Sequence, residues 1–176
     1  MSTERVIVQR SISEPLIKAL TSLTEKIRAG TCSTSHIAPV VTPASAANIL
    51  SLITDAHSRG ASVLVGDLSR TDAVIQPHIL LNVEPGWPLW ERESFGPVCA
   101  IKIAETEDEA VTLANCTEYT LMGAVWTKDV ARGLTVARKI HAGQVVINAP
   151  TFAAEPGLGV HGLGYVTIRL KQTLLC

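Results

Sequence analysis

Two hydrophobic periods follow one another at the start of the chain. A short β-branched run from Arg5 to Gln9, bounded by polar residues, predicts a mostly buried strand. From Leu16 to Ile27 the apolar residues recur every three or four positions, which predicts a helix. Ser13 is the expected N-cap of this helix, and Gly30 is its expected left-handed stop.

A second helix and three strands are predicted next. The helix runs from Pro43 to Arg59, with Gly60 beyond its end. The predicted strands are Ser62–Val65, His78–Val83 and Val98–Ile103. Residues 84–93, EPGWPLWERE, hold two prolines and two tryptophans and are predicted to form a surface loop.

Helices and strands alternate regularly in the second half of the chain. Thr106 and Glu109 form a capping box for a predicted helix to Asn115, and Asp129 caps a predicted helix to His141. The predicted strands here are Gly123–Trp126, Gln144–Ile147 and Val166–Leu170. This alternation predicts an α/β fold with an open, largely parallel twisted sheet flanked by helices. The last strand alternates like an exposed one, so we expect it to pair with something outside the domain.

Composition narrows the partners and the chemistry. The 176 residues suit one medium domain, and 15 basic against 16 acidic side chains provide no basic surface, so neither a nucleic acid nor a membrane is expected as a partner. Only 18% of the residues are charged, which predicts a homodimer or higher oligomer that hides part of the surface. No signal core is visible, so a cytoplasmic location is expected. The four cysteines lack metal-binding spacing, and no metal is expected.

Four segments of the sequence resemble segments of one protein family, and they occur in the same order as in that family. They are MSTERVIVQ at residues 1–9, WERESFGPV at 90–98, LANCTEYTLMGAVWTKD at 113–129 and AGQVVIN at 142–148. They resemble the C-terminal part of the catalytic domain of the aldehyde dehydrogenase superfamily. Within that superfamily, the segments ERESFGPV and QPHILLNV are most similar to those of benzaldehyde and salicylaldehyde dehydrogenases. The resemblance implies a truncated catalytic domain over residues 1–165 and a C-terminal strand or oligomerisation tail over 166–176.

This resemblance also implies roles for individual residues. Glu93 matches the family's ribose-binding carboxylate and Phe95 the neighbouring aromatic, a vestigial cofactor wall. Asn148, Thr151 and Phe152 match the lining of the substrate tunnel. The matched region begins just after the family's catalytic cysteine, and the Rossmann domain lies further upstream. We therefore expect the chain not to oxidise aldehydes by itself and to need no cofactor, with NAD(P) expected only for a full-length enzyme.

Three functions are compatible with these residues. The first is a repurposed non-redox enzyme, a cyclase or isomerase acting on a small hydrophobic metabolite in an oligomer pocket, with Glu93, His141, His161 and Tyr165 as candidate catalytic groups. The second is a non-catalytic pseudoenzyme that serves oligomerisation or partner binding. The third is a fragment of a full-length NAD(P)-dependent aldehyde dehydrogenase.

Overall fold

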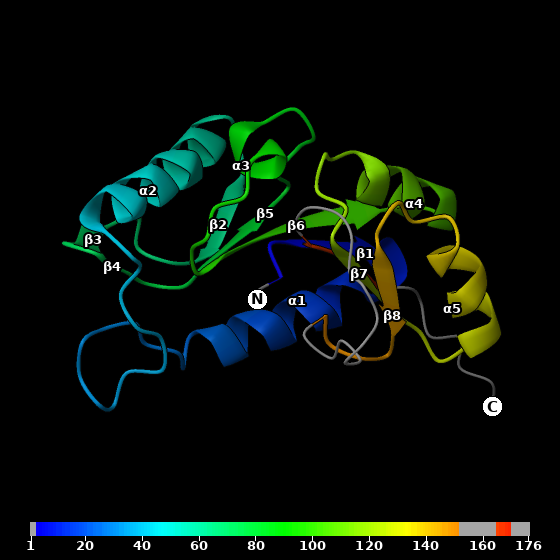
Figure 1. The fold of residues 1–176 in the computed structure, drawn as a ribbon, viewed down its shortest axis with the longest axis horizontal. Helices are drawn as coiled ribbons and strands as arrows, with labels where there is room; N and C mark the ends of the chain where they lie inside the picture. The colour runs from blue at the N-terminus through cyan, green and yellow to red at the C-terminus, as the bar shows by residue number, and fades with distance from the viewer. Residues whose placement is uncertain (1–2, 152–164, 170–176) are drawn as a thin grey trace. The chain divides into compact units, whose positions relative to one another are not determined.

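The computed structural model describes residues 3–151 and 165–169 (Figure 1). The chain forms two compact units. Unit 1 combines Met1–Glu14 with Lys102–Cys176, and unit 2 is Pro15–Ile101. No helix in the described ranges is long and apolar enough to cross a membrane.

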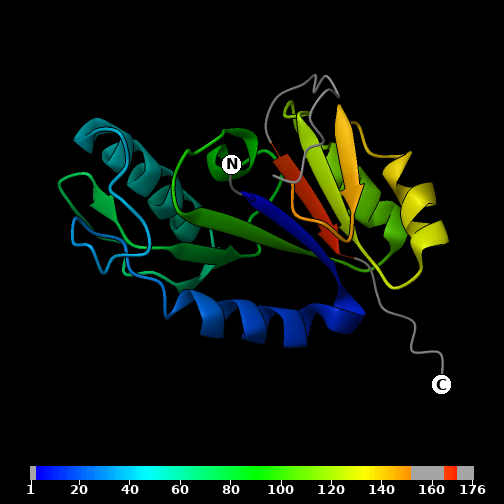
Figure 2. The same cartoon turned by 60° about the horizontal axis from the view of Figure 1, so that its bottom comes forward.

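The described part of unit 1 is built on parallel strands that lie in the order β1, β9, β7, β8. They are β1 (Arg5–Gln9), β7 (Met122–Trp126), β8 (Gln144–Ile147) and β9 (Tyr165–Arg169). Helix α4 (Glu107–Asn115) contacts β1 and β9, and helix α5 (Val130–Ala137) contacts β7 and β8 (Figure 2). Strands that helices cover carry continuous apolar runs. Ile7, Val8 and Val125 belong to such runs and are fully buried.

Local capping sets both helices of unit 1. The Thr106 hydroxyl accepts a hydrogen bond from the Glu109 N–H at 3.1 Å, and the Asp129 carboxylate accepts one from the Arg132 N–H at 2.9 Å, so both predicted N-caps are confirmed. The Glu109 carboxylate accepts from the N–H of Glu105, one residue before the cap. Helix α5 ends at Ala137, so the prediction that it reaches His141 is wrong.

Unit 2 also has a strand layer with helices beside it. Strand β5 (His78–Leu81) pairs antiparallel with β2 (Ser62–Val65) and parallel with β6 (Val98–Ala104), which continues into unit 1. Helix α2 (Pro43–Ser58) starts at its N-cap Thr42 and buries one apolar face. The predicted α/β fold with a largely parallel sheet is therefore confirmed: the described strand pairs of unit 1 are parallel, and unit 2 adds the antiparallel strand β2 beside the parallel pair β5 and β6.

Three other predictions are corrected in the first hundred residues. Helix α1 (Arg10–Thr24) follows β1 directly, and Ser13 lies inside it with its hydroxyl donating to the Arg10 carbonyl, so Ser13 is not the N-cap and the helix stops before Gly30. The predicted loop at residues 84–93 contains the short helix α3 (Pro88–Glu91), because Pro88 suits the first helical position. A hairpin of β3 (Arg70–Thr71) and β4 (Val74–Ile75), too short to show a period, was not predicted.

The last described strand is placed differently from the prediction. Strand β9 lies between β1 and β7 and pairs with both, so both of its edges are used inside unit 1. The expectation that this strand offers an edge for pairing outside the domain is therefore wrong for residues 165–169. The role of the remaining tail, residues 170–176, lies outside the described residues.

Candidate functional site

The segment between α3 and β6 presents a backbone that is held in an uncommon conformation. Phe95 has a positive φ of 54°, and the residue is 79% exposed. Positive φ is rare for a bulky residue and is often found where the surroundings impose it at a functional position. The buried Ser94 hydroxyl accepts a hydrogen bond from the Gly96 N–H at 3.1 Å, which closes the turn around Phe95.

Gly96 anchors this turn against helix α2. A Cβ atom at Gly96 would lie 2.7 Å from Cδ1 of the fully buried Ile49, so only glycine permits the close approach. The next residue, Pro97, accepts a hydrogen bond from the His78 N–H at 2.8 Å. The backbone on the C-terminal side of Phe95 is thus fixed, while Phe95 itself is among the exposed large hydrophobic residues.

Glu93 lies two residues before Phe95 and is half-buried. A carboxylate accepts hydrogen bonds from hydroxyl groups, and an exposed aromatic ring offers a flat apolar face. The assignment of Glu93 and Phe95 to a cofactor site stays a prediction. The structure thus places the two predicted cofactor-wall residues on one short turn.

The predicted substrate-binding residues are placed in unit 1. Asn148 follows β8 and has a positive φ of 54°. Its side-chain Oδ1 accepts a hydrogen bond from the Thr127 N–H at 2.8 Å, and its Nδ2 donates one to the Thr127 carbonyl at 2.7 Å. Thr151 is buried. Phe152 lies outside the described residues. The Asn148 amide thus has a structural role, and its predicted contact with substrate stays a prediction.

The four predicted catalytic residues do not form a described cluster. Glu93 belongs to unit 2, and the exposed His141 belongs to unit 1, where its N–H donates to Asn115 Oδ1 at 2.8 Å. For Tyr165 the structure gives the backbone in β9, opposite Met122. His161 lies outside the described residues.

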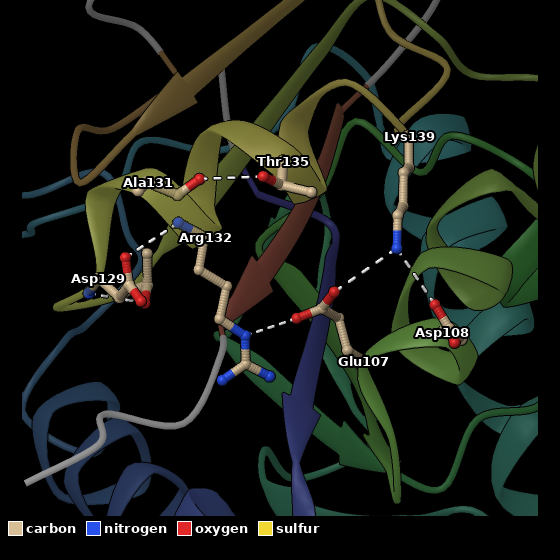
Figure 3. Close-up of polar contacts among 8 residues, drawn as sticks. Glu107, Asp108, Asp129, Ala131, Arg132, Thr135 and Lys139 are labelled. Carbon is tan, nitrogen blue, oxygen red and sulfur yellow. Dashed lines mark hydrogen bonds and ion pairs between the residues drawn. The ribbon is translucent and has the colours of Figure 1, made fainter.

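An ion-pair cluster links α4 to the segment that carries α5 (Figure 3). The Glu107 carboxylate lies between Arg132, at 2.6 Å, and Lys139, at 3.6 Å, and Asp108 lies 3.3 Å from Lys139. The hydrogen bond from Lys139 to Asp108 and the nearby carboxylates raise the pKa of Lys139. Each of these charged groups forms an ion pair with a group of opposite charge, so the cluster joins α4 to the segment that carries α5. The sequence showed the acidic first turn of α4 but not its distant cations.

No group of three or more metal-ligating side chains is brought together among residues 3–151 and 165–169.

The sequence profile described as "Aldehyde dehydrogenase family" matches residues 1–165. The chain belongs to the aldehyde dehydrogenase family.

Aromatic aldehyde dehydrogenases are among the relatives of this family member, as predicted. The chain is 33% identical to vanillin dehydrogenase of Pseudomonas fluorescens over 179 residues, which cover 99% of the chain and 37% of that enzyme. It is 34% identical to salicylaldehyde dehydrogenase of Pseudomonas putida, over 94% of the chain and 35% of that enzyme. The structure of a NAD-dependent benzaldehyde dehydrogenase from Corynebacterium glutamicum superposes with a TM-score of 0.80 at 27% identity, over 86% of this chain and 33% of that one. The chain thus spans about a third of the length of these relatives.

Proposed function

We propose that residues 93–97 form part of the cofactor-binding wall of a NAD(P)-dependent aldehyde dehydrogenase that acts on small aromatic aldehydes. The observation that carries this proposal is the turn at Phe95, a residue that is 79% exposed on a backbone fixed by Ser94 and Gly96. An exposed aromatic on a rigid, strained turn is preorganised for a ligand, because little further ordering is needed when the ligand binds.

The family membership supplies the chemical context for this proposal. When bound, NAD(P) supplies the hydride acceptor for oxidation of an aldehyde. The Glu93 carboxylate would accept hydrogen bonds from sugar hydroxyl groups of the cofactor, and the Phe95 ring would pack against a planar ring and exclude water from it. The preference for aromatic aldehydes is proposed from the vanillin and salicylaldehyde dehydrogenase relatives.

In residues 3–151 and 165–169, no observation favours the cyclase or isomerase hypothesis. Of its candidate catalytic residues, Glu93 and His141 belong to different units, and the side chains of His161 and Tyr165 lie outside the described part of the chain. The pseudoenzyme hypothesis likewise stays a prediction, and the third hypothesis, membership of an aldehyde-oxidising enzyme, is the one we adopt.

A chimaeric enzyme tests the proposal. The matching third of vanillin dehydrogenase is replaced by this chain, and Glu93→Gln and Phe95→Ala are introduced into the chimaera. Removing a hydrogen-bonded charge is worth about 1.5–3 kcal/mol, so Glu93→Gln is expected to raise the KM or Kd for NAD(P) by about tenfold or more. NAD(P)H binding, followed by cofactor fluorescence, provides a readout that is independent of turnover.

Glu118→Gln is the matched control, because Glu118 is exposed and its substitution makes the same charge change elsewhere. It is expected to leave cofactor affinity unchanged. A folded chimaera that binds cofactor equally well with Glu93→Gln and Glu118→Gln would refute the proposed wall. A folded chimaera that binds no cofactor at all would refute it as well.

A further inference from the structure

Unit 2 contains a hollow of about 490 Å³ that the aldehyde dehydrogenase assignment does not use. One part of its lining comes from the end of α1 and the residues just after it, and the rest comes from residues 65–67 and 76–77. The first part consists of Thr24, Glu25, Ile27 and Arg28. Val65 is the last residue of β2, and Gly66 and Asp67 belong to the loop that follows it. A buried side chain contacts this loop and accepts a hydrogen bond from it.

That side chain is His78, the first residue of β5, which is only 1% exposed. Its Nδ1 lies 2.7 Å from the carbonyl oxygen of Gln76, and its Nε2 lies 3.2 Å from the backbone nitrogen of Leu68. A carbonyl only accepts and a backbone N–H only donates. Nδ1 therefore carries the proton and Nε2 is the acceptor, so the histidine is neutral.

The loop is pressed closely onto this ring. A Cβ atom at Gly66 would lie 2.1 Å from Cδ2 of His78, so the Gly66 backbone lies directly against the imidazole. Gly66 has a positive φ of 116°. Leu68 has a φ of 53°, which is a left-handed conformation that is unfavourable for leucine. The bond from Leu68 to Nε2 therefore holds the loop in a conformation that leucine does not favour by itself.

We propose that His78 is a pH-sensitive latch, and that its protonation releases the loop Gly66–Ser69 and opens the wall of the hollow. The proton comes from solvent and takes the lone pair of Nε2. Nε2–H and the Leu68 N–H then face each other as two donors, and the hydrogen bond between them is lost. The strain at Leu68 favours movement of the loop once this bond is gone.

The electrostatic surroundings keep the latch closed near neutral pH. Burial lowers the pKa of His78 from its ordinary value of 6.5, while the Gln76 carbonyl and the negative charge of Asp67 act in the opposite direction. Asp67 Oδ1 is itself held by the Ser69 N–H at 3.1 Å. Glu25 and Arg28 are the other charged residues that line the hollow. Acidification below about pH 6.5 is thus the condition that opens the loop.

Hydrogen exchange of the Leu68 amide tests the latch directly in the full chain. The protection factor, corrected for intrinsic exchange with an unstructured peptide of residues 62–72, is measured between pH 7.5 and 5.5. The open loop leaves His78 with its ordinary pKa, so the protection factor is expected to fall by up to about tenfold over this range. Amides of α4 are expected to keep their protection.

His78→Gln is the diagnostic variant, because the amide oxygen can accept from Leu68 but does not titrate in this range. It is expected to remove the pH dependence. The matched control is His57→Gln, an exposed histidine on α2, which is expected to keep it. A Leu68 protection factor that does not change with pH, or the same pH dependence in His78→Gln, would overturn the latch.

A second measurement covers the case in which His78→Gln does not fold. The ring nitrogens of His78 are followed by ¹⁵N chemical shift in the wild-type protein. Titration of Nε2 in step with loss of Leu68 protection, while the rest of unit 2 stays folded, is the expected result. A ring that stays neutral down to global unfolding would overturn the proposal.

Discussion

The side chain of Asn148 replaces a strand partner for the backbone of Thr127. Asn148 Oδ1 accepts from the Thr127 N–H at 2.8 Å, and Nδ2 donates to the Thr127 carbonyl at 2.7 Å. Gln76 makes the same double contact with the backbone of Ala29, at 3.1 Å in both directions. Asn115 similarly donates to the Lys139 carbonyl and accepts from the His141 N–H. Three amides thus extend the backbone pairing where regular elements end, which satisfies groups that would otherwise be unpaired.

Replacement of Asn148 is therefore expected to reduce stability. Asn148→Ala removes both bonds and also places alanine at a positive φ, so we expect the free energy of unfolding to fall by about 2–4 kcal/mol. Asn148→Gly removes the bonds but relieves the backbone, and its loss is expected to be about 1 kcal/mol smaller. Urea unfolding measures both values. Equal stability of all three proteins would contradict the structural role of this amide.

The parts of the fold that depend on contacts between residues close together in the sequence were predictable from the sequence. Thr106 and Asp129 cap helices through bonds to residues three positions later, and the sequence shows both partners. The place of β9 between β1 and β7 was not predictable, because an alternating pattern does not specify which strands lie on either side. The contact of Asn148 with Thr127 joins residues 21 positions apart, so this structural role of the amide could not be predicted from the sequence.

The candidate site was predictable to a similar extent. The family resemblance placed Glu93 and Phe95 together, because they are adjacent in one motif. The positive φ of Phe95 and the dependence of Gly96 on Ile49 appear only in three dimensions. His78 offered no local pattern, since the loop that it holds lies ten residues earlier.

The close contact between Gly66 and His78 predicts a strong effect of one methyl group. Gly66→Ala introduces an atom that overlaps the buried ring at a positive φ, so we expect a loss of about 3 kcal/mol or more in unfolding free energy. Gly60→Ala is the matched control, because Gly60 also has a positive φ, 112°, but nothing lies within 4 Å of its added Cβ. Its expected loss is about 1–2 kcal/mol. Chemical denaturation that finds equal losses would rule out the overlap as the cause.

The ion-pair cluster predicts unequal effects of two adjacent acids. Glu107 touches both Arg132 and Lys139 and its side chain is 21% exposed, whereas Asp108 touches Lys139 alone and is 88% exposed. Glu107→Gln is expected to lower the unfolding free energy by about 1 kcal/mol, and Asp108→Asn by a few tenths at about the limit of measurement. Both acids lie in the first turn of α4, so the loss of favourable charge near the helix N-terminus is common to both. Thermal unfolding at low and high salt checks the difference, which added salt is expected to reduce.

The low charge content predicts self-association. With 18% charged residues, the chain has fewer charged side chains than an average protein of its size, so we expect a homodimer or larger particle. Size-exclusion chromatography with light scattering is expected to give at least twice the chain mass of 18.7 kDa. A mass of one chain at all accessible concentrations would contradict this prediction.

Burial of His78 predicts the direction in which stability changes with pH. Its pKa is lowered in the folded protein, so below pH 6.5 the unfolded chain binds more protons than the folded one. The free energy of unfolding is therefore expected to be constant with respect to this group above pH 6.5 and to fall as the pH decreases through the folded pKa. The bond to Arg10 lowers the pKa of Glu105 from 4.5, so the contribution of that carboxylate is lost only at more acidic pH. Urea unfolding at pH 5.5, 6.5 and 7.5 stays above the range of Glu105 and follows the change in the range of His78. His78→Gln is expected to flatten the dependence over this window, and a wild-type slope retained in that variant would assign the effect to another group.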